Sequence, residues 1–223
     1  MNKHSAVLLS IASGIMQILL LAALHFLSPK FDPTWRVISE YALGQFSWVL
    51  SLMFITGALN VWALVYSLKN EIITKSGRVG LVFLIISGIG TALAAVFEIP
   101  HPLHNIAGLL GVLGLPLGAM LVSISISRMP RWMNAKNVIL WTANLTWIGL
   151  AVFVVSMIVL MVTYARAGGD MSIKPDAIEK VLPHGTIAYN GIANRILVLL
   201  TPLWTIAVAR QLIKFEQIPT RNK

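Results

Sequence analysis

Four titratable side chains are the candidates for metal chemistry in this chain. His101 and His104 stand three residues apart, and Glu98 precedes them by about one helical turn. At a helix start this spacing could place both imidazoles on one side, and imidazole and carboxylate are ligands that zinc takes in proteins. His184, in a later loop, could add a further ligand. However, two prolines in the segment indicate a turn and no HExxH motif is present, so histidines capping a loop are the plainer interpretation. We expect no cofactor, with zinc or another divalent metal as the alternative.

Ser39, Glu40 and Glu98 are the candidates for catalysis. A serine acts as a nucleophile only when a base lies within hydrogen-bond reach, and Glu40 directly follows Ser39. One serine beside one glutamate is a weak signal, and a serine on a helix surface is the plainer interpretation. The chain has no GxSxG, Walker, dinucleotide-binding or CxxC motif. The sequence therefore carries no demonstrable catalytic motif.

Composition decides the class of protein that carries these side chains. Lys, Arg, Asp and Glu make up 11% of the 223 residues, against about 25% in soluble domains. Apolar residues make up 57%, and the mean hydropathy is +0.80. So few charges cannot cover the surface of a soluble globule, so the chain is predicted to be an integral membrane protein. This excludes a soluble enzyme and a disordered tail, and the absence of cysteine also excludes a secreted disulfide scaffold.

Apolar runs predict an all-α fold, a polytopic bundle of six transmembrane helices that forms a single domain over residues 1–223. At about 1.5 Å per residue, each run is long enough to cross a hydrocarbon core of roughly 30 Å. The first run is also longer than the roughly 7–15 apolar residues of a signal peptide. The runs do not alternate in polarity, as the strands of a membrane barrel do. The predicted spans are 6–27, 48–68, 79–97, 106–126, 138–164 and 192–213.

The distribution of charge predicts that both termini are cytoplasmic. Lysine and arginine concentrate in the cytoplasmic loops of membrane proteins. If the N-terminus is cytoplasmic, the inner segments hold most of the basic residues, namely Lys3, Lys69, Lys75, Arg78, Arg128, Arg131, Lys136, Arg210, Lys214, Arg221 and Lys223. These residues are scattered over short loops rather than along one helix face, so a pI near 10.2 does not indicate a nucleic-acid partner. We expect a cell membrane, with membrane lipid as the partner.

Arg195 marks a predicted polar cluster at the outer end of the bundle. It lies directly before an apolar run, where a charge costs several kcal/mol unless it reaches outward or pairs. Two interpretations stay open: the side chain extends to the membrane surface, or it pairs with a carboxylate, first Glu98 and second Glu40. The predicted cluster comprises Glu40, Glu98, His104, Arg195, Arg36 and Asn194.

The first outer loop contains a further element. Trp35, Ile38 and Tyr41 recur at three-to-four spacing within Thr34–Phe46. We therefore expect a short amphipathic helix on the outer surface, or a re-entrant element that caps the bundle. Its opposite face would carry Arg36, Ser39 and Glu40.

Small and polar residues within the spans indicate how the helices pack. The fourth span has a glycine repeat that permits close helix approach, either inside the bundle or in a homo-oligomer. The repeat consists of Gly108, Gly111, Gly114 and Gly118. The polar side chains expected to hydrogen-bond between helices are Gln17, Asn60 and Asn144.

Three segments resemble a known family. The segments ISEYALG (38–44), FEIPHPLHNIAG (97–108) and NGIANR (190–195) are similar to those of a bacterial and archaeal membrane family, domain of unknown function 998 (DUF998). The resemblance spans nearly the full length and implies a six-span membrane protein. It matches positions Ser39, Glu40, Glu98, His104 and Arg195. The ISE segment and the histidine that opens the fourth span are also similar to six-span DRAM/Sfk-type proteins, some of which are tied to autophagy or lipid-anchor remodelling. The family supplies no established reaction.

Three functions are consistent with these patterns. The first is a non-catalytic or lipid-handling membrane protein in which the polar cluster is a structural lock. The second is an intramembrane hydrolase or transferase that acts on lipid at the outer leaflet, with a metal held by Glu98, His101, His104 and His184. The third is a small-molecule transporter, which is disfavoured because transporters place ionisable residues near the bilayer midplane, where this chain offers only amides and threonines.

Overall fold

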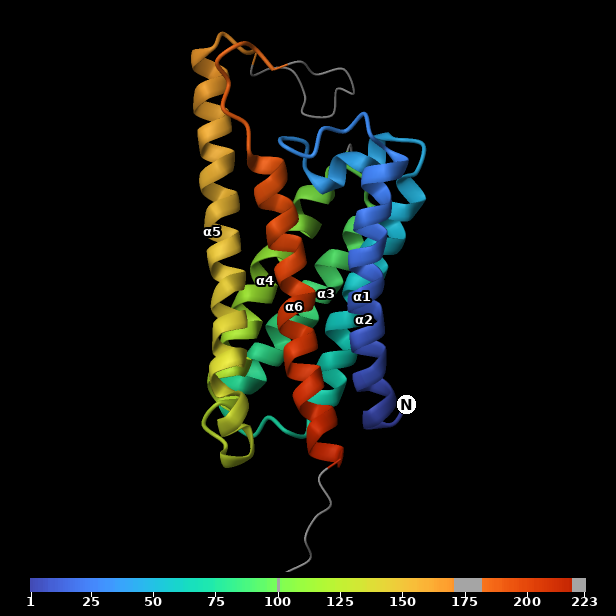
Figure 1. Cartoon of the computed structure of the whole chain (residues 1–223), viewed down its shortest axis with the longest axis vertical. Helices are drawn as coiled ribbons and strands as arrows, with labels where there is room; N and C mark the ends of the chain where they lie inside the picture. Colours follow the sequence, from blue (N-terminus) through green and yellow to red (C-terminus); the bar gives the residue numbers. More distant parts are fainter. Residues whose placement is uncertain (100, 171–181, 218–223) are drawn as a thin grey trace, which may run out of the picture.

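The computed structural model describes residues 1–99, 101–170 and 182–217, and over these residues the chain is an all-helical bundle (Figure 1). Six helices are long and apolar enough to cross a membrane. They are α1 (Lys3–Leu27), α2 (Ser47–Leu68), α3 (Lys75–Val96), α4 (His104–Ile126), α5 (Lys136–Arg166) and α6 (Asn190–Gln217). Two short 3-10 helices, η1 (Ile38–Leu43) and η2 (Pro130–Ala135), lie in the connections. The six predicted spans are confirmed.

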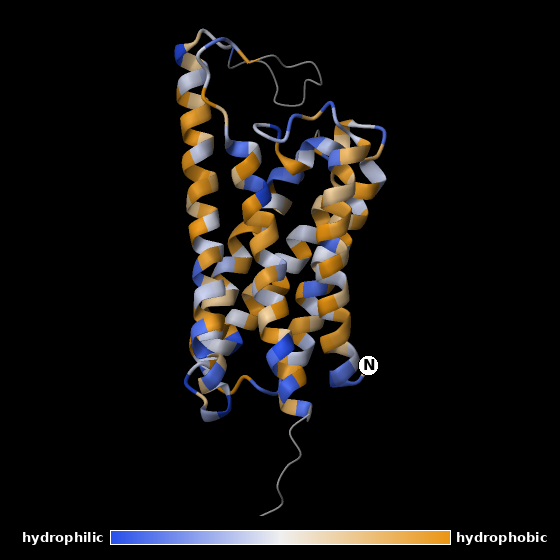
Figure 2. Cartoon of the chain, in the orientation of Figure 1, coloured by the Kyte–Doolittle hydropathy of each residue, from blue (hydrophilic) through white to orange (hydrophobic). Residues whose placement is uncertain are grey.

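Each helix begins slightly before its predicted apolar run, because its first turn is polar or capped. The Asn2 side chain accepts the backbone N–H of Ser5 at the start of α1, and the Thr74 side chain accepts that of Gly77 at the start of α3. Such caps satisfy amide groups that have no partner within the helix. A search for apolar runs misses these first turns. Figure 2 shows the resulting pattern, with hydrophobic helix surfaces between polar ends.

The glycine repeat of α4 packs against α3 inside the bundle. A Cβ atom on Gly114 would come within 2.9 Å of the Phe83 carbonyl oxygen, and one on Gly118 within 2.8 Å of the Gly80 carbonyl oxygen. Gly108 has no neighbour within 4 Å. The close helix approach predicted for this repeat is therefore made between α3 and α4.

Asn60 connects three helices in the buried centre of the bundle. Its side-chain amide donates to the Ser10 carbonyl oxygen of α1 at 2.6 Å, and its side-chain oxygen accepts the Thr205 hydroxyl of α6 at 2.8 Å. This is the interhelical bonding that we expected. The expectation was wrong for Asn144, which is exposed and donates to the Leu140 carbonyl oxygen of its own helix. A polar side chain in a span can satisfy itself locally when it faces away from the other helices.

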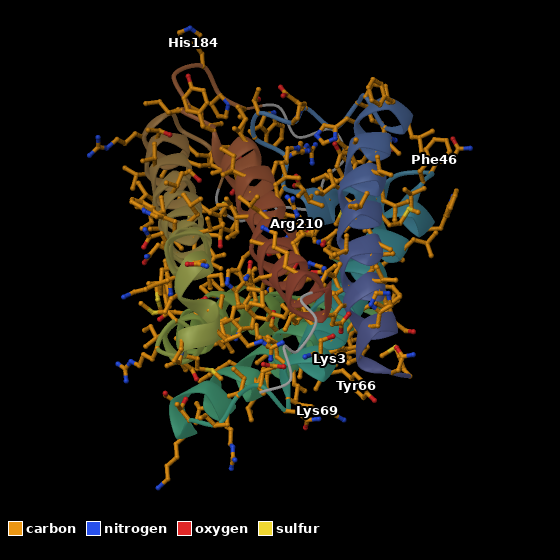
Figure 3. The ribbon with its side chains drawn as sticks, turned by 60° about the horizontal axis from the view of Figure 1, so that its bottom comes forward. Lys3, Phe46, Tyr66, Lys69, His184 and Arg210 are labelled. Carbon is orange, nitrogen blue, oxygen red and sulfur yellow. The ribbon has the colours of Figure 1, made fainter. Side chains whose placement is uncertain are left out.

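The start of α1 and the end of α6 lie at the same end of the bundle (Figure 1). Glu71 holds this end together, because its carboxylate pairs with Lys3 and, at 3.1 Å, with Arg131. Figure 3 shows Lys3 and Lys69 at this end and His184 at the other. We call the end where α1 finishes and α6 begins the outer end, following the side that the charge distribution predicts for it.

Candidate functional site

The segment between α1 and α2 folds across the start of α6 at the outer end (Figure 1). Phe31, Ile38 and Tyr41 anchor it, because their side chains are buried against the outer ends of α1 and α2. The expected short helix is present as η1. Arg36 and Glu40, which we expected on the face opposite Trp35, Ile38 and Tyr41, are both buried, at 3% and 6% exposed. The segment therefore caps the bundle with polar side chains inside.

Backbone hydrogen bonds attach this segment to the first turn of α6. The Thr34 carbonyl oxygen accepts the N–H groups of Gly191 and Ile192, at 3.0 and 3.2 Å. The Asn190 side-chain amide donates to the Trp35 carbonyl oxygen at 2.7 Å. These bonds satisfy amide groups at the start of α6 that have no partner within the helix.

The same attachment continues one turn further into α6. The Asn194 side-chain oxygen accepts the backbone N–H of Ile38 at 2.9 Å. We call residues 34–41, residues 190–195 and His25 together the outer clasp.

Gly191 is required by the close approach of the two backbones in the outer clasp. A Cβ atom at this position would lie 2.5 Å from the Pro33 carbonyl oxygen and 2.7 Å from the Arg36 carbonyl oxygen. Because both neighbours are backbone atoms, and the Arg36 carbonyl oxygen is also held by Arg195, they cannot move aside as the end of a side chain could.

We expect Gly191→Ala to lower the stability of the protein by about 1–3 kcal/mol, the usual cost of overpacking. The matched control is Gly108→Ala, a helical glycine with open space around it, where alanine should stabilise by up to about 1 kcal/mol. The measurement is the thermal unfolding midpoint in detergent, followed by tryptophan fluorescence. Equal midpoints for the two variants would show that the backbones do not need this close approach.

Arg195 lies at the centre of the outer clasp and is only 8% exposed. Its Nε donates to His25 Nε2 at 2.7 Å, its Nη1 to the Arg36 carbonyl oxygen at 2.6 Å, and its Nη2 to the Tyr41 hydroxyl at 3.0 Å. Nη1 also donates to the Gly191 carbonyl oxygen at 3.0 Å. All three guanidinium nitrogens are therefore bound by neutral acceptors of the protein.

This arrangement differs from both interpretations of Arg195 that the sequence left open. The side chain is buried, so it does not extend to the membrane surface. Among the described residues it forms no ion pair with Glu98 or Glu40. Backbone carbonyl oxygens, a phenol and an imidazole take the place of the expected carboxylate.

The contact with Arg195 fixes the hydrogen position on His25. His25 Nδ1 lies 2.7 Å from the Leu21 carbonyl oxygen, which can only accept, so Nδ1 carries the hydrogen. Nε2 faces the Nε–H of Arg195, which can only donate, so Nε2 carries none. His25 is therefore a neutral acceptor, and its ring is held between α1 and α6.

Arg36 and Glu40 form a buried ion pair beside Arg195. Arg36 Nη1 lies 3.4 Å from Glu40 Oε1, and Glu40 Oε2 accepts the N–H of Val37 at 3.0 Å. The Arg36 guanidinium also lies 4.4 Å from the centre of the Trp35 ring, a cation–π distance. Buried charges of this kind require such compensation, because each loses its hydration.

The structure does not bring Glu98 and the candidate metal ligands together. Glu98 is exposed. His104 Nδ1 lies 2.7 Å from the Phe97 carbonyl oxygen, and His101 stacks on the Phe97 ring and accepts the N–H of Leu103. Both histidines thus cap the turn between α3 and α4, while His184 lies in the connector after α5. Among the described residues, no three His, Asp or Glu side chains are placed to hold one metal ion.

Four of the predicted cluster residues converge and two do not. Arg36, Glu40, Asn194 and Arg195 meet in the outer clasp, whereas Glu98 and His104 lie at the α3–α4 turn. Ser39 is half-buried, and in the described part of the chain its hydroxyl donates no hydrogen bond to a base. The clasp members that the prediction missed are Tyr41, Asn190, Gly191 and His25. The sequence signal for Asn190 and Gly191 was the Asn-Gly pair that they form at the start of the last span.

The comparisons with known proteins agree with this fold. The family model described as "Protein of unknown function (DUF998)" matches residues 11–211. No curated protein and no solved structure matches the chain. The match includes all of η1 and the residues of the outer clasp, which agrees with the resemblance carried by the same segments. The chain therefore belongs to the DUF998 family of multi-pass membrane proteins.

Proposed function

We propose that the protein handles lipid and that its outer clasp is structural rather than catalytic. The observation that carries the proposal is the enclosure of Arg195, whose three nitrogens all donate to protein acceptors. A guanidinium that binds or activates a substrate must direct donors at it, and here those donors are used to hold three chain segments together. We further propose that both termini are cytoplasmic and that the protein lies in the plasma membrane of a bacterium or archaeon.

The exposure of the outer half of α5 is the reason for proposing lipid as the class of ligand. Beyond Leu150, Tyr164 is the only α5 side chain that is buried, so this half of the helix faces whatever surrounds the bundle. In a membrane that is lipid. A helix half with so little protein packing supports a role in binding lipid molecules.

The test is native mass spectrometry of the full-length protein extracted in a mild detergent, with elemental analysis of the same sample. We expect phospholipid to remain bound through gel filtration, and we expect treatment with a metal chelator to leave this bound lipid unchanged. Ser39→Ala and Glu98→Gln, which remove candidate catalytic groups, should also retain lipid at the wild-type level.

Two outcomes would contradict the proposal. Protein that retains no lipid would contradict a lipid-handling role. About one zinc per chain, together with loss of lipid binding in chelator, would instead favour the metal-dependent hydrolase or transferase, because zinc in enzymes binds tightly and survives mild purification.

A further inference from the structure

The outer half of α5 carries two hollows, one apolar and one beside basic side chains, which we together call the groove. Its lower part is a hollow of about 370 Å³, lined mainly by Val152, Val155, Val159 and the Tyr189 ring. Its upper part is a hollow of about 270 Å³ next to Thr163, Arg166 and His184.

The two hollows follow one face of the helix. Positions 152, 155, 159, 163 and 166 recur at intervals of three or four residues, and side chains at this spacing lie along one side of an α-helix. Val155 is 59% exposed and Val159 is 36% exposed, so among the described residues this face is largely uncovered. Figure 1 shows the outer half of α5 with the 182–189 connector alongside.

The connector between α5 and α6 forms the second wall of the groove. The N–H of Ile187 donates to Thr163 Oγ1 at 3.0 Å, which fixes the connector against α5 at the junction of the two hollows. Gly185 has a φ of +91°, a conformation that favours glycine, and it forms the turn that follows His184. The groove is therefore built by two segments and held by a specific hydrogen bond.

The dimensions of the groove match one leaflet of a bilayer. From residue 152 to residue 163, eleven residues of helix rise about 16 Å, and half of a 30 Å hydrocarbon core is about 15 Å. The length of this face from residue 152 to residue 163 thus suits one acyl chain, and Arg166 follows about one turn further along the helix. Arg166 is exposed, and it forms no ion pair with any residue that the structure describes.

We propose that this groove binds one anionic phospholipid of the leaflet at the outer end, with an acyl chain along Val152–Val159 and the phosphate group at Arg166 and His184. This inference rests on the proposed lipid-handling function and names the site and the lipid class. Acyl chains meet equally apolar surroundings among neighbouring lipids, so the apolar hollow provides shape but little selectivity. Arginine can bind the phosphate oxygens of any phospholipid through two parallel hydrogen bonds. Selection must therefore come from the rest of the head group, because a zwitterionic lipid adds a cation that Arg166 repels and an anionic lipid does not.

The test compares phosphatidylglycerol with phosphatidylcholine of identical acyl chains. Each lipid is added at equal concentration to the full-length, delipidated protein, and bound lipid is counted by native mass spectrometry. We expect wild type to retain about tenfold more phosphatidylglycerol, because both lipids carry the same phosphate but the choline cation of phosphatidylcholine is repelled by Arg166 at short range. The double variant Arg166→Gln/His184→Gln should lose this preference, while Arg128→Gln, an exposed arginine at the other end of the bundle, should keep it.

A second pair of variants tests the apolar hollow. Val155→Trp fills it, whereas Val154→Trp adds the same side chain to the neighbouring position, which is also exposed but does not line the groove. We expect Val155→Trp to lower the retention of both lipids several-fold and Val154→Trp to leave it unchanged. Both substitutions are on exposed positions, so both variants should fold.

The outcomes separate this inference from the proposed function. Lipid retained equally by wild type, by the Arg166/His184 variant and by Val155→Trp would overturn the groove and leave lipid handling in place. Equal retention of the two lipids by wild type would overturn the selection of an anionic head group. Failure of wild type to retain either lipid would overturn both.

Discussion

Replacing Arg195 by methionine is expected to destabilise the protein by about 3 kcal/mol or more. Methionine keeps much of the side-chain volume but leaves His25 Nε2 and the Tyr41 hydroxyl without the donor that they face. The Arg36 carbonyl oxygen loses its side-chain donor as well. Each buried polar group left unsatisfied costs about 1–3 kcal/mol, and the three losses occur together at one site.

This loss should appear as a fall of about 10 °C in the thermal unfolding midpoint, since 1 kcal/mol shifts the midpoint of a chain of this size by roughly 2–4 °C. The measurement is tryptophan fluorescence of the purified protein in detergent. The control is Arg210→Met, an exposed arginine on the same helix, which should unfold within about 2 °C of wild type. A similarly small shift for Arg195→Met would show that the outer clasp does not hold the bundle together.

Arg195→Lys separates geometry from charge. An ammonium group keeps the positive charge but cannot direct donors to acceptors on α1, η1 and the preceding segment at the same time, whereas the planar guanidinium can. We therefore expect lysine to restore only part of the lost stability. Full restoration would mean that the charge alone is needed at this position.

The six helices could be predicted from the sequence because their signal is local. A run of about twenty apolar residues is sufficient to identify a span, and neither its neighbours nor its partners need to be known. The same holds for the glycine repeat of α4, whose close packing follows from small residues at one spacing. What this local pattern could not provide was the identity of the partner helix, α3, which contacts Gly114 and Gly118.

The outer clasp could be predicted only in part, because its contacts join residues far apart in the sequence. Arg195 meets His25 and Arg36 across 170 and 159 positions. The predicted apolar surroundings of Arg195 indicated that it has a partner. A carboxylate was the expected partner because opposite charges attract strongly in such surroundings. Backbone carbonyl oxygens satisfy a guanidinium equally well, and every residue has one. No pattern of side chains reveals which of them will be used.

The turn between α3 and α4 illustrates the opposite error. Its histidines and glutamate are close in sequence, and this suggested a shared site. In the structure, His101 and His104 bond to the turn itself, and Glu98 is exposed. Proximity along the chain places titratable groups in one loop, but the backbone groups of a short turn also need partners, and here the histidines provide them.

Glu40→Gln is expected to destabilise the protein by about 3–5 kcal/mol, the cost of removing one partner of a buried ion pair. The glutamine side-chain oxygen can still accept the N–H of Val37, but the variant removes the carboxylate charge that faces the Arg36 guanidinium, which is 3% exposed. Glu98→Gln is the matched control, because it makes the same chemical change at an exposed glutamate. It should shift stability by no more than about 0.5 kcal/mol.

The pair Arg36–Glu40 and the pair Arg195–Glu98 can then be compared in double-mutant cycles. Arg36→Met added to Glu40→Gln should cost far less than the sum of the single losses, because it also removes the buried charge that the Glu40 carboxylate faces. Arg195→Met added to Glu98→Gln should be additive, since these residues do not meet. Non-additivity in the second cycle and additivity in the first would reverse the assignment, and would place the ionic contact of the outer end at the α3–α4 turn.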